Sequence, residues 1–186
     1  MKRRTFLLGT GVLTGMGLVT ASGRWHSKQT SVSAVPPTRN FIVSGKETLR
    51  QRAIAKGLLY GAALQSKQVE TDSVFAKAIV QECNIIVPES ELKWRVVRPS
   101  PSVYHFAPAD KLLSFANTHN MKVRGHTLVW HEDLPSWVNS SLNSLNAKQI
   151  LTDHISTAVK HYAGKMHSWD VVNEALNEDG TMRKSI

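Results

Sequence analysis

The sequence contains one cysteine, Cys83, among 186 residues. A single thiol excludes an intrachain disulfide and any metal site built from several cysteines. Cys83 ends an apolar segment with helical spacing, which favours a small buried hydrophobic side chain. The folded state must therefore be stabilised by a packed core rather than by covalent cross-links.

The sequence also lacks an apolar run long enough to cross a membrane. The run near the N-terminus has roughly fourteen residues interrupted by glycines, whereas a spanning helix needs about twenty. It follows a basic cluster at residues 2–4 and precedes small residues, which is typical of a signal peptide. The arginine pair in that cluster resembles the twin-arginine type. We expect residues 1–21 to be a signal peptide that directs export to the periplasm or the extracellular space, with an uncleaved anchor as the alternative and no stable membrane partner.

No dense basic run is present, although the formal net charge is +9. Lysine and arginine are scattered through expected helices without interleaved aromatic residues. This distribution is typical of a solvated surface, and we expect no nucleic-acid partner.

Residues 22–45 are rich in Ser, Thr and Pro and are predicted to be a flexible linker. From Glu47 onward, strand-like and helix-like segments alternate, which favours βα units around a parallel sheet. The predicted strands are 58–63, 84–87, 122–128 and 168–173. The predicted helices are 73–83, one that starts at Pro108, and 150–162, which ends before Gly164.

Polar residues follow the second, third and fourth predicted strands. Barrel enzymes build their active sites at the carboxyl ends of parallel strands. The run from Trp169 to Ala175 ends an apolar strand with Asn173 and Glu174, and a Glu at that position is suited to acid/base chemistry. The alternative for this run alone is a core strand whose last residues cap a turn.

Three segments resemble glycoside hydrolase family 10, the endo-β-1,4-xylanases. Residues 125–138 read GHTLVWHEDLPSWV, close to that family's GHTLVWHxQLPxWV. Residues 87–94 read VPESELKW, close to its TPENEMKW, and residues 169–175 supply the third match. The resemblance implies a (β/α)8 barrel that hydrolyses internal bonds of β-1,4-xylan with retention of configuration. A barrel usually needs about 250 residues, so residues 46–186 are expected to form its N-terminal half, with four to five βα units and the helices on one side of the sheet.

The resemblance also implies roles for individual residues. Glu174 matches the general acid/base residue, and Asn173 matches the residue that hydrogen-bonds the sugar 2-hydroxyl. Four further residues match positions that contact sugar, namely Glu89, Lys93, His126 and Trp130.

The sequence departs from the family pattern at two positions. Ser90 stands where the family has Asn, and Asp133 stands where it has Gln. Both positions contact the more distal sugar in the family, and neither Ser nor ionised Asp has an amide's hydrogen-bonding capacity. These departures leave another β-glycan open as the substrate. The family nucleophile is a Glu on the seventh strand, and no residue of this chain is assigned that role. We therefore expect the chain alone to be inactive and poorly folded.

Two other classes of function remain as alternatives. A metal hydrolase would need histidine ligands, and five candidates are present, but their spacing and the lack of an HExxH motif argue against it: His126, His131, His154, His161 and His167. We expect no metal and no cofactor. A non-catalytic carbohydrate-binding protein is the second alternative, because five tryptophans are available to stack on sugar rings.

Overall fold

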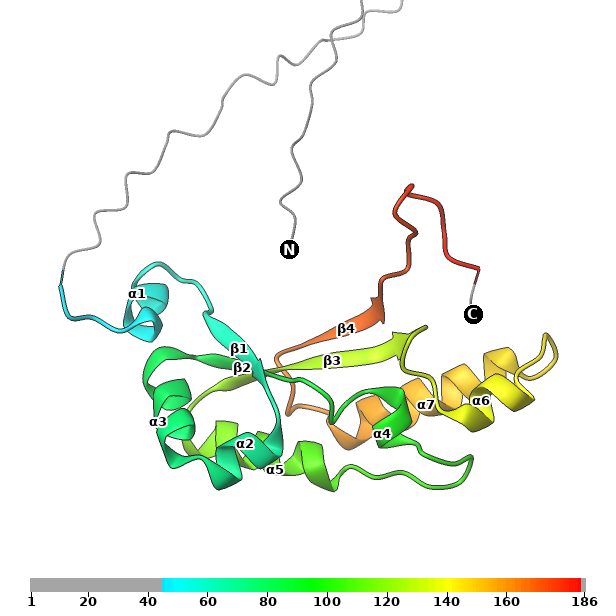
Figure 1. Ribbon diagram of the computed structural model, residues 1–186, viewed down its shortest axis with the longest axis horizontal. Coiled ribbons are helices and arrows are strands. Elements are labelled where there is room, and N and C mark those ends of the chain that lie inside the picture. The colour runs from blue at the N-terminus through cyan, green and yellow to red at the C-terminus, as the bar shows by residue number, and fades with distance from the viewer. Residues whose placement is uncertain (1–44, 185–186) are drawn as a thin grey trace, which may run out of the picture. The chain divides into compact units, whose positions relative to one another are not determined.

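The computed structural model describes residues 45–184 (Figure 1). The expected signal peptide and nearly all of the expected linker lie outside the described residues. Four strands form one sheet in the order β1-β2-β3-β4, and each strand is parallel to its neighbour. Their bounds are β1 (Gly61–Leu64), β2 (Ile85–Pro88), β3 (Lys122–Trp130) and β4 (Ser168–Asn173). Sequential parallel strands joined through helices are the construction of a (β/α) barrel, so the predicted partial barrel is confirmed.

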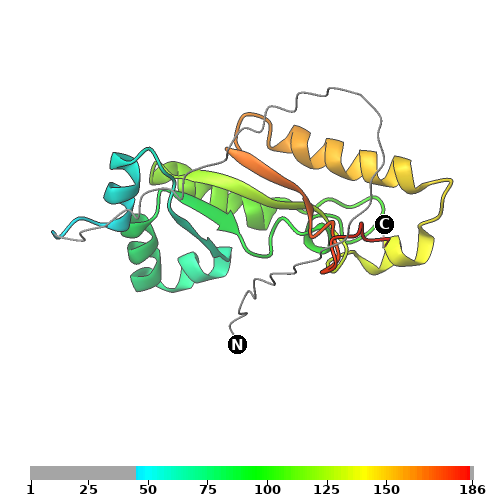
Figure 2. The same ribbon diagram turned by 90° about the horizontal axis from the view of Figure 1, so that it is seen from above.

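Seven helices occur among the described residues: α1 (Leu49–Ala55), α2 (Ser66–Thr71), α3 (Ser73–Glu82), α4 (Trp94–Val97), α5 (Ala107–Thr118), α6 (Ser136–Ser141) and α7 (Ala147–His161). Figure 1 shows α2 to α7 along one side of the sheet, whereas the chain after β4 rises from the other side. Seen from above, α1 to α3 lie near one end of the strands, and α7 runs alongside β4 toward the other end, where α6 lies (Figure 2). None of these helices combines the length and apolarity that a membrane crossing requires.

The long helices begin and end where local chemistry favours it. The Asp72 carboxylate accepts hydrogen bonds from the amides of Val74 and Phe75, which satisfies two free donors at the start of α3. Pro108 lies in the first turn of α5, where its missing N–H costs nothing. After α7, Gly164 adopts a φ of +73°, a left-handed conformation that glycine tolerates.

The core lies between the sheet and these helices. Its larger cluster joins strand residues such as Leu64 and Ile86 to Ile79 of α3 and Leu112 of α5. A smaller cluster joins Leu128 and Val129 of β3 to Ala158 of α7. Cys83 belongs to the larger cluster and is 3% exposed, and burial raises the pKa of its thiol. The prediction of a buried cysteine is confirmed.

The first three strands differ from their predicted bounds, the second only by a shift of one residue, from 84–87 to Ile85–Pro88. Residues 58–60 were expected in the first strand but precede it and are exposed. Pairing starts at Gly61 opposite Ile85, where a Cβ atom would lie 2.0 Å from the Ile85 carbonyl oxygen. Only glycine permits this approach of the two strands. The third strand runs two residues beyond its predicted end, which places Trp130 on β3 rather than after it.

A second close approach fixes β3 against β4. A Cβ atom on Gly125 would lie 2.2 Å from the Trp169 ring, so the ring occupies the space that any other residue would need. The strands pair from Arg124 opposite Ser168 to Trp130 opposite Asn173, with an irregularity between His126 and Val129. This register brings the polar ends of both strands together.

Candidate active site

The six residues assigned from the sequence lie at or near the carboxyl ends of β2, β3 and β4. Glu89 follows β2 directly, and Lys93 precedes α4 in the same connection. His126 lies within β3, Trp130 is its last residue, and Asn173 and Glu174 end and follow β4. Because the strands are parallel, the carboxyl ends of all three lie at the same end of the sheet (Figure 1).

The Glu174 carboxylate is held by Trp130. The indole Nε1 donates a hydrogen bond of 2.9 Å to Glu174 Oε2. Glu174 also has a φ of +52°, a left-handed conformation that is uncommon for a side chain of this size. The Arg183 guanidinium donates to the Glu174 carbonyl oxygen at 3.0 Å, which supports the turn after β4. Backbone and side chain therefore both direct this exposed carboxylate toward the end of β3.

His126 is oriented by Asp170 of the neighbouring strand. Its Nδ1 lies 3.1 Å from Asp170 Oδ2, and Asp170 also accepts hydrogen bonds from the Arg124 guanidinium. Burial opposes ionisation of Asp170, but the bonds from Arg124 and His126 outweigh it and lower the pKa of that carboxyl. An ionised Asp170 keeps the imidazole in one orientation.

Lys93 and Trp130 lie together, supported by Asp133. Lys93 Nζ lies 4.8 Å from the centre of a Trp130 ring, a cation–π distance, and 3.6 Å from Asp133 Oδ2. The other oxygen of Asp133 pairs with Arg95 Nε at 2.7 Å. Asp133 is buried, and both of its oxygens are engaged by cations. It therefore positions Lys93 in this structure and is not free to contact a sugar.

Glu89 stands apart from the other five residues. It is exposed, and Gln65 donates to its carboxylate at 3.3 Å. No contact found within residues 45–184 joins it to Lys93 or to the β3 and β4 residues. The neighbouring Glu91 is buried and accepts hydrogen bonds from the amides of Ser66 and Ser90. Glu91 thus ties the loop that carries Glu89 and Ser90 to the start of α2.

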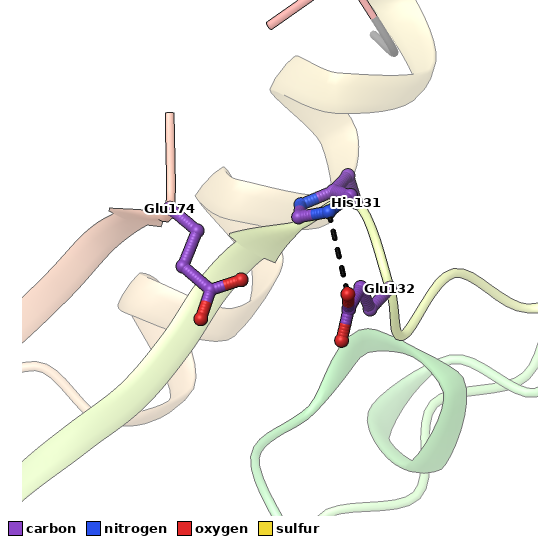
Figure 3. Close-up of side chains that lie close together, drawn as sticks. All are labelled: His131, Glu132 and Glu174. Atoms are coloured by element: carbon purple, nitrogen blue, oxygen red, sulfur yellow. Dashed lines mark ion pairs between the residues drawn. The ribbon is translucent and has the colours of Figure 1, made fainter. Parts of the chain in front are cut away.

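A second carboxylate lies near Glu174. His131, Glu132 and Glu174 place one nitrogen and two carboxylate oxygens within 4.8 Å of one another (Figure 3). His131 Nε2 is 3.7 Å from Glu132 Oε1. Glu132 matches no nucleophile motif, and we assign it no catalytic role.

Sequence reasoning missed the residues that orient the site. Asp170, Glu91 and Arg95 each act through a neighbour, and none shows a pattern of its own in the sequence. A partial signal exists for Asp170, because strand alternation places Arg124 and His126 of β3 on the same face. Two basic side chains on one face call for an acidic partner on the adjacent strand.

The sequence profile of glycosyl hydrolase family 10 matches residues 48–186. The chain belongs to this family. Endo-1,4-beta-xylanase 3 of Hypocrea jecorina is 36% identical over 140 residues, which cover 75% of this chain and 40% of that protein. A beta-1,4-xylanase of Dictyoglomus thermophilum is 48% identical over 96 residues, covering 52% of this chain and 27% of its own.

Solved family 10 structures share the fold. Xylanase 10B of Thermotoga petrophila, crystallised with xylobiose, superposes with a TM-score of 0.72 at 37% identity, covering 76% of this chain and 44% of its own. Xylanase 10B of Thermotoga maritima gives a TM-score of 0.71 at 37% identity, with 74% and 44% covered. This chain thus spans about two fifths or less of the length of these family 10 relatives, and the profile match at residues 48–186 includes all four strands.

Proposed function

We propose that the protein acts in endo-hydrolysis of β-1,4-xylan with retention of configuration. The observation that carries this proposal is the position of Glu174. This residue follows β4, and its carboxylate accepts a hydrogen bond of 2.9 Å from the Trp130 indole N–H. Glu174 protonates the leaving oxygen as general acid and then deprotonates the attacking water as general base. A Trp N–H aimed at one oxygen fixes the carboxyl group for both proton transfers.

The remaining assigned residues bind sugar around this carboxyl group. Asn173 hydrogen-bonds the 2-hydroxyl, an interaction that strengthens as the oxocarbenium-like transition state develops. His126, which Asp170 orients, and the indole face of Trp130 form the walls of the site for the sugar next to the scissile bond. Lys93 donates to sugar hydroxyls from its place over Trp130, and Glu89 accepts from the next sugar outward.

The departures from the family pattern bear on the choice of substrate. Both oxygens of Asp133 form ion pairs, one with Arg95 and one with Lys93. Asp133 therefore cannot replace the amide that the family presents to the distal sugar at this position. Ser90 offers one hydroxyl in place of an amide. The distal contacts therefore rest on Glu89 and Lys93, and comparing xylan with mannan and mixed-linkage glucan as substrates tests the specificity.

The assignment of Glu174 is tested in a hybrid barrel, in which residues 46–186 are joined to the C-terminal part of the Thermotoga petrophila xylanase 10B barrel. That part supplies the nucleophile from the seventh strand. Glu174→Gln should nearly abolish hydrolysis of xylan, lowering kcat by about 100-fold or more, because proton transfer contributes 10²–10⁴-fold. The same variant should retain activity on aryl xylosides with activated leaving groups, which depart without protonation. The control is Glu178→Gln, the next Glu along the chain. Equal losses on both kinds of substrate would contradict a general-acid role.

Carbohydrate binding without catalysis is the second candidate. It is favoured by one observation, that the sequence contains five tryptophans, whose rings can stack on sugars. Affinity electrophoresis in xylan gels distinguishes the two candidates. A protein that is retarded by xylan, while its hybrid barrel releases no reducing sugar, would support binding alone.

Export by a twin-arginine signal at residues 1–21 remains part of this proposal. It is supported by the basic cluster, the short apolar run and the small residues that follow. Fusing residues 1–45 to a reporter that matures only after export, and replacing Arg3-Arg4 with lysines, tests it. Export that is unaffected by the replacement would contradict the twin-arginine route.

A further inference from the structure

We propose that His131, Glu132 and Glu174 form a binding site for a divalent transition-metal ion of the Zn²⁺ class (Figure 3). An ion held there occupies the carboxylate assigned as general acid/base, so it inhibits hydrolysis reversibly. The inhibitory part of this inference rests on the proposed function, whereas the binding part does not.

The three ligand atoms need to move only slightly closer together to bind one ion. The three ligand atoms lie within 4.8 Å of one another, with His131 Nε2 and Glu132 Oε1 at 3.7 Å. Zn–N and Zn–O bonds near 2.1 Å in a tetrahedron place ligand atoms about 3.4 Å apart. The Glu132 side chain is 61% exposed, and Glu174 is exposed as well. The Glu132 carboxylate can therefore turn toward His131 and Glu174 without disturbing the core.

The cluster brings two carboxylates together, although Lys148 and Arg183 line the same pocket as Glu174. Among the described residues, no salt bridge pairs a Lys or Arg with either carboxylate. Lys93 is engaged by Asp133, and Arg183 bonds the backbone oxygen of Glu174 rather than its carboxylate. Two carboxylates close together repel each other. A divalent cation removes that repulsion.

His131 is fixed in a position suited to a metal ligand. Its side chain is 15% exposed, and its ring meets the Trp130 ring at an interplanar angle of 87°. Nε2 faces Glu132, with 3.7 Å between Nε2 and Glu132 Oε1, and Nδ1 points away from the cluster, buried without a partner among the described residues. The Glu174 carboxylate keeps the Trp130 N–H on one oxygen and has a second oxygen for the ion. One imidazole and two carboxylates with open positions suit Zn²⁺, whereas Mg²⁺ prefers six oxygen ligands.

The site depends on a residue outside the assigned sugar contacts. Glu132 occupies the variable position of the segment that resembles WHxQ, so the family pattern does not require a carboxylate there. Glu132 can therefore be changed without touching the residues proposed for sugar binding or proton transfer. This separates metal binding from catalysis.

Isothermal titration calorimetry of the untagged hybrid barrel, whose added strands cover the open sheet, with ZnCl₂ in a non-chelating buffer tests the binding. We expect one Zn²⁺ per chain and no comparable heat with MgCl₂. Glu132→Gln should weaken Zn²⁺ binding by at least about tenfold, since loss of even an outer partner of a metal ligand costs 10–100-fold. The matched control is Glu70→Gln, which removes an exposed carboxylate that pairs with Lys111 elsewhere. Circular dichroism checks that all variants keep the same helix content.

Absence of stoichiometric Zn²⁺ binding, or Glu132→Gln binding as tightly as the parent, would overturn the proposal. In activity assays of the same hybrid barrel, Zn²⁺ should inhibit xylan hydrolysis and EDTA should restore it. Glu132→Gln should tolerate at least tenfold more Zn²⁺. Binding without inhibition would support the site and contradict the acid/base role of Glu174. An inactive hybrid that still binds Zn²⁺ through Glu132 would contradict the proposed function alone. If the Glu132→Gln variant failed to hydrolyse xylan in the absence of metal, the claim that Glu132 takes no part in catalysis would be wrong.

Discussion

At the scale of single residues, His154 shows how burial decides the state of an ionisable group. It is 1% exposed, its ring stacks on Trp94 with centroids 4.0 Å apart, and Nε2 lies 3.1 Å from the Leu128 carbonyl oxygen. Burial lowers the pKa of His154 from 6.5 to about 4, although the bond to Leu128 opposes this shift. The imidazole is therefore neutral in the folded protein and joins α7 to β3 as a hydrogen-bond donor.

The resulting prediction concerns the pH dependence of stability. Between pH 6.5 and about 4 the unfolded chain binds a proton at His154 and the folded chain does not, so stability falls as the pH drops through that window and this contribution levels off below it. The loss amounts to about 3 kcal/mol. His154→Gln keeps a donor for Leu128 and should remove this part of the slope in urea unfolding of the hybrid barrel.

The control for this prediction is Ile155→Val, a neighbouring apolar change on α7. It should cost about 1 kcal/mol at every pH and leave the slope unchanged. A His154→Gln slope equal to that of the parent would show that another group carries the pH dependence.

At the scale of elements, α3 depends on its first turn. The Asp72 carboxylate accepts from the Val74 and Phe75 amides at 3.0 and 2.9 Å. Asp72→Ala leaves both amides without that acceptor and should destabilise the hybrid barrel by about 1 kcal/mol. Lys77→Ala, at an exposed position of the same helix, is the control and should change stability by a few tenths of that amount. Equal urea midpoints for the two variants would contradict the capping role.

The elements also show which parts of the fold the sequence predicts. The helix predicted at 73–83 is α3, ending one residue earlier, because this segment has helical spacing and an N-cap. β4 has its predicted bounds. The helices α1, α2, α4 and α6 have four to seven residues and were not predicted. Helices this short are held by tertiary contacts rather than by propensity.

In the candidate site, too, the sequence predicts some features and not others. The alternation of strands and helices predicts that the polar residues after β2, β3 and β4 lie together at the carboxyl end of the parallel sheet. It does not predict that Asp133 joins Arg95 to Lys93, or that Glu132 approaches Glu174, since these contacts depend on how the chain turns after β3. Loop conformation is set by the packed elements and has no period of its own in the sequence.

At the scale of the whole described region, the sheet is open at both edges. Among the described strands, β1 pairs only with β2, and β4 only with β3. Large apolar side chains on and after β4 are half-exposed or more, namely Val171, Val172, Leu176 and Met182. Unpaired strand edges beside apolar surface promote association between chains.

We therefore expect the 186-residue chain, expressed alone, to self-associate and to release no sugar from xylan. Retaining hydrolysis requires a nucleophilic carboxylate as well as an acid, and no described residue is assigned as that nucleophile. Size-exclusion chromatography with light scattering measures the association, and a reducing-sugar assay measures turnover. The hybrid barrel is the matched comparison and should be monomeric and active, because its added strands cover both edges and supply the nucleophile. A chain that is monomeric, unfolds cooperatively and cleaves xylan at a rate unchanged by Glu174→Gln would contradict both the open-sheet argument and the acid assignment.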